Sequence, residues 1–81
     1  MVIRLHGDLA RAAGEHTARL SLESPLTVRE VVTVLRGLYP GLGVGLDGRA
    51  GRVVVLRNRL PCLLDDPVTD GDLLDLIPEE P

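Results

Sequence analysis

Apolar residues recur at helical spacing in one segment of the chain, between residues 27 and 38. The stripe consists of Val28, Val31, Val32, Leu35 and Leu38. Thr27 is a favourable N-cap, and Glu30 three residues later completes a capping box. Tyr39 precedes Pro40, and the residue before a proline is pushed out of the α-helical region. The pattern predicts a helix that buries all five apolar residues against a sheet.

Strand patterns precede this helix. Residues 2–5 place apolar side chains around Arg4, and residues 9–13 form a short helical piece that Gly14 stops. Residues 17–22 alternate, with apolar side chains on one side and polar side chains on the other. We expect residues 17–22 to form a half-buried strand that makes a hairpin with the first strand.

Glycine and proline divide the second half of the chain. Residues 41–51 hold five of the nine glycines without phosphate-loop spacing, which predicts a plain loop across one end of the sheet. Residues 52–56 are rich in valine and predict a strand, and residues 57–59 its turn. Residues 60–64 predict a shorter returning strand, which Pro61 marks as a sheet edge.

The C-terminal segment contains a turn and a final strand. Asp70-Gly71-Asp72 is a tight-turn signal, and residues 73–77 form an apolar run typical of a strand buried on both faces. Proline cannot donate to a strand ladder, so we expect Pro78 to end this strand. Asp75 is an acid within the apolar run, and we expect it to face solvent beside an arginine of a neighbouring strand.

These elements predict a single α+β domain over residues 1–81, with a short C-terminal tail at residues 78–81. The element order predicts a mixed sheet of four to five strands covered by one main helix. This is the β-grasp layout of ubiquitin. Residues 2–14, 25–32, 38–42 and 67–78 together resemble the small ubiquitin-like sulfur carriers, namely the small subunit of molybdopterin synthase (MoaD) and the thiamine sulfur carrier (ThiS). The most specific match is Pro67-Val68-Thr69-Asp70-Gly71-Asp72 leading to Leu76-Ile77-Pro78.

The resemblance implies a function in sulfur transfer for cofactor biosynthesis, of the molybdopterin or thiamine type. In such carriers an activating enzyme adenylates the terminal carboxylate, which becomes a thiocarboxylate and donates sulfur. The resemblance therefore implies a larger protein partner, either an adenylating enzyme or a synthase large subunit, and no catalysis by the chain itself.

The end of the chain departs from this family pattern. The carriers end on Gly-Gly, whereas these 81 residues end on Pro78-Glu79-Glu80-Pro81. Glycine backbone fits a narrow adenylation channel, and the ring of Pro81 does not. We expect the 81-residue chain not to be adenylated and a chain extended by Gly-Gly to be competent. The alternative function is a non-catalytic ubiquitin-like interaction module or an accessory subunit of a larger enzyme.

Composition excludes several other classes of function. The formal net charge of −3 and the near absence of aromatic side chains argue against nucleic-acid binding. A lone cysteine, Cys62, excludes an internal disulfide and a cysteine-cluster metal site. The chain begins directly with a strand pattern, and no apolar stretch approaches the roughly 18 residues that cross a bilayer. We expect a cytoplasmic protein that binds neither membrane nor nucleic acid.

Candidate catalytic groups are few. Cys62 lies in an apolar run, where burial raises a thiol pKa, so we interpret it as a buried structural residue. His6 and His16 could meet in the first hairpin, beside Asp8 and Glu15, and form a metal site. Two surface histidines are the favoured interpretation. We therefore predict no catalytic residue, no metal and no cofactor.

The predicted partner-binding residues are the tail and the arginines around the second hairpin. They are Ile77, Pro78, Glu79, Glu80 and Pro81, with Arg52, Arg57 and Arg59. Arg4 and Arg19 lie on strands that could share the outer face of the sheet, although a merely solvated face is the plainer interpretation. The tail has no apolar anchor after Ile77, so we expect it to be mobile in the free protein and ordered in a complex.

Overall fold

The computed structural model describes residues 1–42 and 52–79, and at residues 52 and 79 the backbone alone. The elements in chain order are β1 (Val2–Leu5), α1 (Gly7–Ala13), β2 (Thr17–Arg19), β3 (Leu26–Thr27), α2 (Val28–Leu38), the 3-10 turn η1 (Pro40–Leu42), β4 (Arg52–Arg57), β5 (Leu60–Pro61), β6 (Pro67–Val68) and β7 (Leu73–Glu79). Among these residues, none of the helices combines the length and apolar character needed to cross a membrane.

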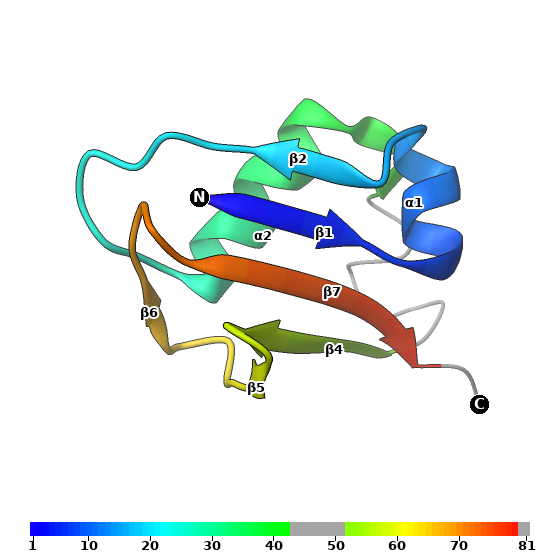
Figure 1. Ribbon diagram of the computed structural model, residues 1–81. Helices are drawn as coiled ribbons and strands as arrows, with labels where there is room; N and C mark the ends of the chain where they lie inside the picture. Colours follow the sequence, from blue (N-terminus) through cyan, green and yellow to red (C-terminus); the bar gives the residue numbers. More distant parts are fainter. Residues whose placement is uncertain (43–51, 80–81) are drawn as a thin grey trace.

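The main sheet has five strands in the order β2-β1-β7-β4-β5. The last strand, β7, lies at its centre, parallel to β1 and antiparallel to β4. Helix α2 covers one face of the sheet, and α1 lies at the end toward which β1 and β7 both run (Figure 1). The predicted mixed sheet under one main helix is confirmed.

The core consists of aliphatic side chains between the sheet and α2. Its fully buried members include Ile3, Leu35, Leu42, Leu74, Leu76, Val28, Val31 and Val68. The capping box of Thr27 and Glu30 is present, so the predicted start of the helix is confirmed. The prediction that Leu38 is buried is wrong, because 56% of it is exposed. The chain leaves the helix at Tyr39, and η1 brings Leu42 into the core at this end instead.

Strand β7 does not end at Pro78, contrary to the sequence prediction. It continues to Glu79, with Pro78 opposite Val53 of β4. The Asp72 carbonyl oxygen accepts a hydrogen bond from β1, and the Leu76 carbonyl oxygen accepts one from the residue that follows β1. Every second residue along this segment therefore points its backbone N–H and C=O groups toward β1. Pro78 is the next in this series and lies beyond the last β1 pair, so its missing donor removes no ladder hydrogen bond.

Several predicted boundaries also shift. The second strand ends at Arg19 rather than at residue 22, and the first helix begins at Gly7. The strand predicted over residues 60–64 spans only Leu60–Pro61, at the sheet edge as expected. The turn before it places Asn58 and Arg59 in the left-handed region, which closes the hairpin tightly. Of the loop predicted over residues 41–51, only residues 41–42 belong to the described part, in η1.

Candidate partner-binding site

The face of the sheet opposite α2 carries the candidate site. Side chains alternate between faces along each strand, so the burial of Ile3, Leu74 and Val55 against the core places their neighbours on the outer face. The outer-face residues of β1, β7 and β4 include Val2, Arg4, Leu73, Asp75, Ile77, Val54 and Leu56. In Figure 1 the described helices leave this face open.

A buried carboxylate lies at the centre of this face. The Asp75 side chain is only 4% exposed and sits beside Arg4 in the register of β7 and β1. Arg4 donates from Nε to Asp75 Oδ1 at 2.7 Å and from Nη2 to Oδ2 at 3.1 Å. His6 Nε2 lies 2.8 Å from the same Oδ1, and an ionised carboxylate only accepts, so the imidazole donates.

These contacts decide the charge of Asp75. The hydrogen bond from Arg4 holds the pKa of Asp75 below its ordinary value of 3.8, and the hydrogen bond from His6 acts in the same direction. The same ion pair raises the pKa of the Arg4 guanidinium. The expectation that Asp75 faces solvent is wrong, although its predicted arginine partner is present. Arg4 and His6 both lie over the carboxylate and exclude water from it.

Aliphatic side chains surround this neutralised carboxylate. Leu56 lies opposite Asp75 and Val54 lies opposite Ile77 in the register of β4 and β7. Val54 is 37% exposed, and Leu56, Ile77 and Leu73 are half-buried. The outer face therefore presents accessible apolar surface around an internally compensated ion pair, a combination that suits a protein partner.

The predicted arginines do not gather at one place. Arg52 pairs with Glu79, whereas Arg57 pairs with Leu74 near the other end of β4. Arg57 donates from Nη1 to the Pro67 carbonyl oxygen at 2.8 Å and so links β4 to β6. Arg59 is exposed in the hairpin turn. Of these three arginines, only Arg52 lies beside the end of β7, and partner binding by any of them stays a prediction.

The tail begins later than predicted. Pro78 and Glu79 are part of β7, so the expectation of mobility directly after Ile77 is wrong for these two residues. Glu80 and Pro81 lie outside the described residues. Pro78 packs on the start of α1, because a Cβ placed on Gly7 would lie 3.0 Å from Pro78 Cγ. The end of β7 is therefore held from one side by β4 and from the other by Gly7.

The remaining candidate groups do not converge. Cys62 is half-buried and its Sγ donates to the Val55 carbonyl oxygen at 3.7 Å. Burial raises the pKa of this thiol. His16 is exposed and its carbonyl oxygen accepts from Leu5, while the imidazole of His6 turns to Asp75. Within residues 1–42 and 52–79, no three His, Cys, Asp or Glu side chains are placed to hold a metal ion.

Comparison with known proteins decides the family. Small archaeal modifier protein 1 of Haloferax volcanii is 33% identical over 79 residues, which cover 93% of this chain and 91% of that protein. The crystal structure of that modifier matches with a TM-score of 0.85 at 33% identity, over 96% of this chain and 94% of the other. This chain belongs to the ubiquitin-like MoaD/ThiS family.

More distant structures show the same fold. A putative molybdopterin converting factor subunit 1 from Pyrococcus furiosus matches with a TM-score of 0.77 at 20% identity, over 95% of this chain and 93% of that one. A complex of subunits 1 and 2 of the molybdopterin-converting factor from Helicobacter pylori matches with a TM-score of 0.67 at 20% identity, over 98% of this chain and 92% of that one. No family model matches the chain. The predicted family and β-grasp fold are confirmed.

Sequence reasoning missed part of the candidate site in this family member. The sequence pattern indicates a surface histidine or a metal ligand at His6, and only strand residues at Val54 and Leu56. The signal that could have found them is the alternation of side chains along a strand. Arg4 and Asp75 each interrupt an apolar strand and therefore lie on the outer face, together with every second residue of the adjacent strands.

Proposed function

We propose that this chain is a ubiquitin-like sulfur carrier or protein modifier that works through its C-terminal segment and is handled by larger proteins. It supplies a carboxylate and a docking surface, and the partner supplies the catalysis. Sulfur transfer for molybdopterin-type or thiamine-type biosynthesis is the finer form of this proposal. A cytoplasmic location, predicted from the lone Cys62, belongs to it as well.

The observation that carries the proposal is the position of β7. It is the central strand of the sheet, and it continues past Leu76, where its pairing with β1 ends, to Glu79. Residues 77–79 therefore extend beyond the pairing with β1 while they stay paired with β4, and the open outer face lies beside them (Figure 1). An extended segment next to an apolar surface lets one partner bind both.

The relatives support this proposal. One that is 33% identical along 93% of the chain is named a small archaeal modifier. A fold neighbour is the first subunit of a two-subunit molybdopterin-converting factor, which supports a larger partner for this chain. In the proposed chemistry, a C-terminal carboxylate oxygen attacks the α-phosphorus of ATP and releases pyrophosphate. Hydrosulfide from the sulfur donor then attacks the carbonyl carbon, the C–O bond to AMP breaks, the sulfur loses its proton to water, and a thiocarboxylate remains.

Intact mass spectrometry tests this chemistry. The 81-residue chain and a version extended by Gly-Gly are each incubated with ATP, a sulfur donor and candidate activating enzymes. We expect the extended chain to gain the mass of one sulfur-for-oxygen exchange and the unextended chain to stay unchanged. A mass gain on the unextended chain would overturn the part assigned to Pro81, and no gain on either chain would remove the carrier function.

A non-catalytic interaction module remains the second candidate, and the apolar outer face around Asp75 favours it. A module binds its partner equally well with and without ATP, and its mass does not change. Capture of a partner under both conditions, with the carrier assay negative, distinguishes this module from a carrier.

A further inference from the structure

The basic residues of this chain are all of one kind. The nine Lys and Arg residues are nine arginines, so the 81 residues contain no lysine. A guanidinium stays protonated at any physiological pH and is not a nucleophile, whereas a lysine amine is the usual acceptor of an isopeptide bond. The amine of Met1 is then the only primary amine that this sequence offers.

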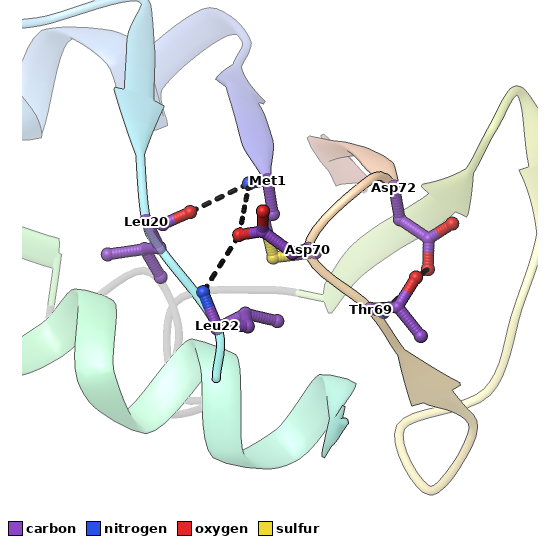
Figure 2. Close-up of polar contacts among 6 residues, drawn as sticks. All are labelled: Met1, Leu20, Leu22, Thr69, Asp70 and Asp72. Atoms are coloured by element: carbon purple, nitrogen blue, oxygen red, sulfur yellow. Dashed lines mark hydrogen bonds and ion pairs between the residues drawn. The ribbon is translucent and has the colours of Figure 1, made fainter. Parts of the chain in front are cut away.

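The Met1 amine is held by two contacts within the fold. It donates to the Leu20 carbonyl oxygen at 2.7 Å and to Asp70 Oδ1 at 3.3 Å (Figure 2). The Met1 side chain is fully buried in the core cluster and the residue as a whole is 8% exposed, whereas the Asp70 side chain is 62% exposed, so the amine is held by its two contacts at the edge of the core. Asp70 Oδ1 also accepts from the Leu22 backbone at 2.8 Å, which joins the amine to the segment after β2.

The turn before β7 aims Asp70 at this amine. Asp72 Oδ2 accepts from the Thr69 backbone at 2.8 Å, and Asp72 donates from its own backbone to the Thr69 carbonyl oxygen at 3.0 Å. These two bonds close the turn around Asp70. Figure 2 shows a further contact within the turn, in which the Thr69 hydroxyl donates to Asp72 Oδ2 at 3.4 Å. The Leu22 N–H, followed by the Met1 amine, lowers the pKa of Asp70, so the partner of the amine stays charged.

We propose that this chain acts only as the donor, and never as the acceptor, when it is conjugated to amines. It is attached to targets in single copies and is not extended into chains of itself. The proposal rests on the proposed function as a modifier. In conjugation, an acceptor nitrogen attacks the carbonyl carbon of the C-terminal adenylate, a C–N bond forms, the C–O bond to AMP breaks, and the amine loses a proton to water. The acceptor therefore needs a nitrogen that is free to approach the adenylate, whereas the Met1 nitrogen is held by the Leu20 carbonyl oxygen and by Asp70 Oδ1.

Arginine is not required at every position by the structure. Arg11 and Arg29 are 84% and 62% exposed in single contacts with carboxylates, a role that a lysine ammonium also performs. Arg36 is exposed near the end of α2. Arg11→Lys and Arg36→Lys should therefore fold normally while each adds one accessible acceptor. Arg4 is unsuitable, because its two-point contact with Asp75 needs the guanidinium.

Chemical acylation tests whether the Met1 amine is held in this way, without reference to any partner. The folded chain is treated with an N-hydroxysuccinimide ester and followed by intact mass spectrometry, with the same chain in guanidinium chloride as the reference. We expect the folded chain to be labelled about tenfold more slowly, or slower still, than the unfolded chain. Arg36→Lys should acquire one label rapidly when folded. Equal labelling rates for the folded and unfolded chain would overturn the proposal.

Conjugation in an extract of the source cell tests the consequence. The untagged chain, with and without a Gly-Gly extension, is incubated with ATP and detected by antibody. We expect the chain extended by Gly-Gly to form targets that carry single copies, and Arg11→Lys and Arg36→Lys in the same extended chain to add further bands at steps of about one chain mass, which is 8.7 kDa for the 81 residues. The unextended chain should form no adduct. Steps of this size from the extended chain without a lysine substitution, with a branch mapped to one of its own residues, would overturn the proposal. If no variant forms any adduct, the function as a modifier fails, and the acylation experiment still decides whether the amine is held.

Discussion

Arg4 and Asp75 are direct neighbours on the parallel strands β1 and β7 and form a two-point ion pair between them. The contact joins the first and last strands of the main sheet on its outer face. Its two members differ in exposure: the Arg4 side chain is 41% exposed and the Asp75 side chain 4%. The guanidinium therefore shields the carboxylate from water, and the stability of the domain depends on the ionisation of Asp75.

Asp75→Asn should lower the free energy of unfolding at neutral pH by about 1–3 kcal/mol, because it removes the charge that Arg4 and His6 both contact. The pKa of Asp75 is lowered in the folded state, so its contribution is present above the ordinary value of 3.8. The contribution is lost as the pH falls through the folded pKa. Urea unfolding at several pH values should show the difference between the two chains shrinking below pH 3.8.

Asp65→Asn is the matched control, because Asp65 pairs with Arg29 and both side chains are largely exposed. It should change the free energy of unfolding by less than about 0.5 kcal/mol at every pH. A difference between the original chain and Asp75→Asn that stays constant down to strongly acidic pH would contradict the assigned ion pair.

Leu35→Ala should cost about 2–5 kcal/mol, because Leu35 is fully buried between α2 and the sheet. Leu38→Ala is its control on the same helix: this side chain is 56% exposed, and its loss should cost less than about 1 kcal/mol. Denaturant midpoints measure both. Equal shifts of the two midpoints would show that the helix is rotated relative to this packing.

Gly7→Ala and Gly37→Ala should change stability in opposite directions. Gly7 has a φ of +56°, and a Cβ there would press on Pro78 Cγ at 3.0 Å, so alanine should cost about 1–2 kcal/mol. Gly37 lies in α2 with open space around it, and alanine should stabilise the helix by about 0.5–1 kcal/mol. Thermal unfolding reads both signs. A stabilising Gly7→Ala would disprove the contact that holds the end of β7.

Val54→Asp should weaken partner binding at least about tenfold, because it places a charge in the apolar outer face. Val34→Asp is the control, since Val34 is 41% exposed on α2 and its loss leaves the outer face intact. Titration calorimetry with a partner captured from the source cell measures both affinities. We also expect the affinity of the original chain to fall as salt rises, through its exposed arginines. An equal loss for both variants would show that the partner binds elsewhere.

Most of the fold could be predicted from local patterns, and the candidate site could not. The capping box, the helix end at Tyr39 and the edge position of Pro61 depend on neighbouring residues, and all three were predicted correctly. The contact between Asp75 and His6 joins residues 69 positions apart, so no local pattern contains it. The prediction that Pro78 ends the last strand is wrong for a related reason. Whether β7 can include a proline at this position depends on where β1 ends, because beyond the last β1 pair the missing donor removes no hydrogen bond.

The sequence by itself determined the two helices, the strands of the main sheet, their order and the family, because hydrophobic period, turn residues and caps act over a few residues. It also determined that the chain carries arginine and no lysine. Only the tertiary structure decided that Asp75 is buried, that Leu42 replaces Leu38 in the core, and that the Met1 amine is held by Leu20 and Asp70. Each of these depends on which strands become neighbours, and burial and ion pairing arise only when distant segments pack together.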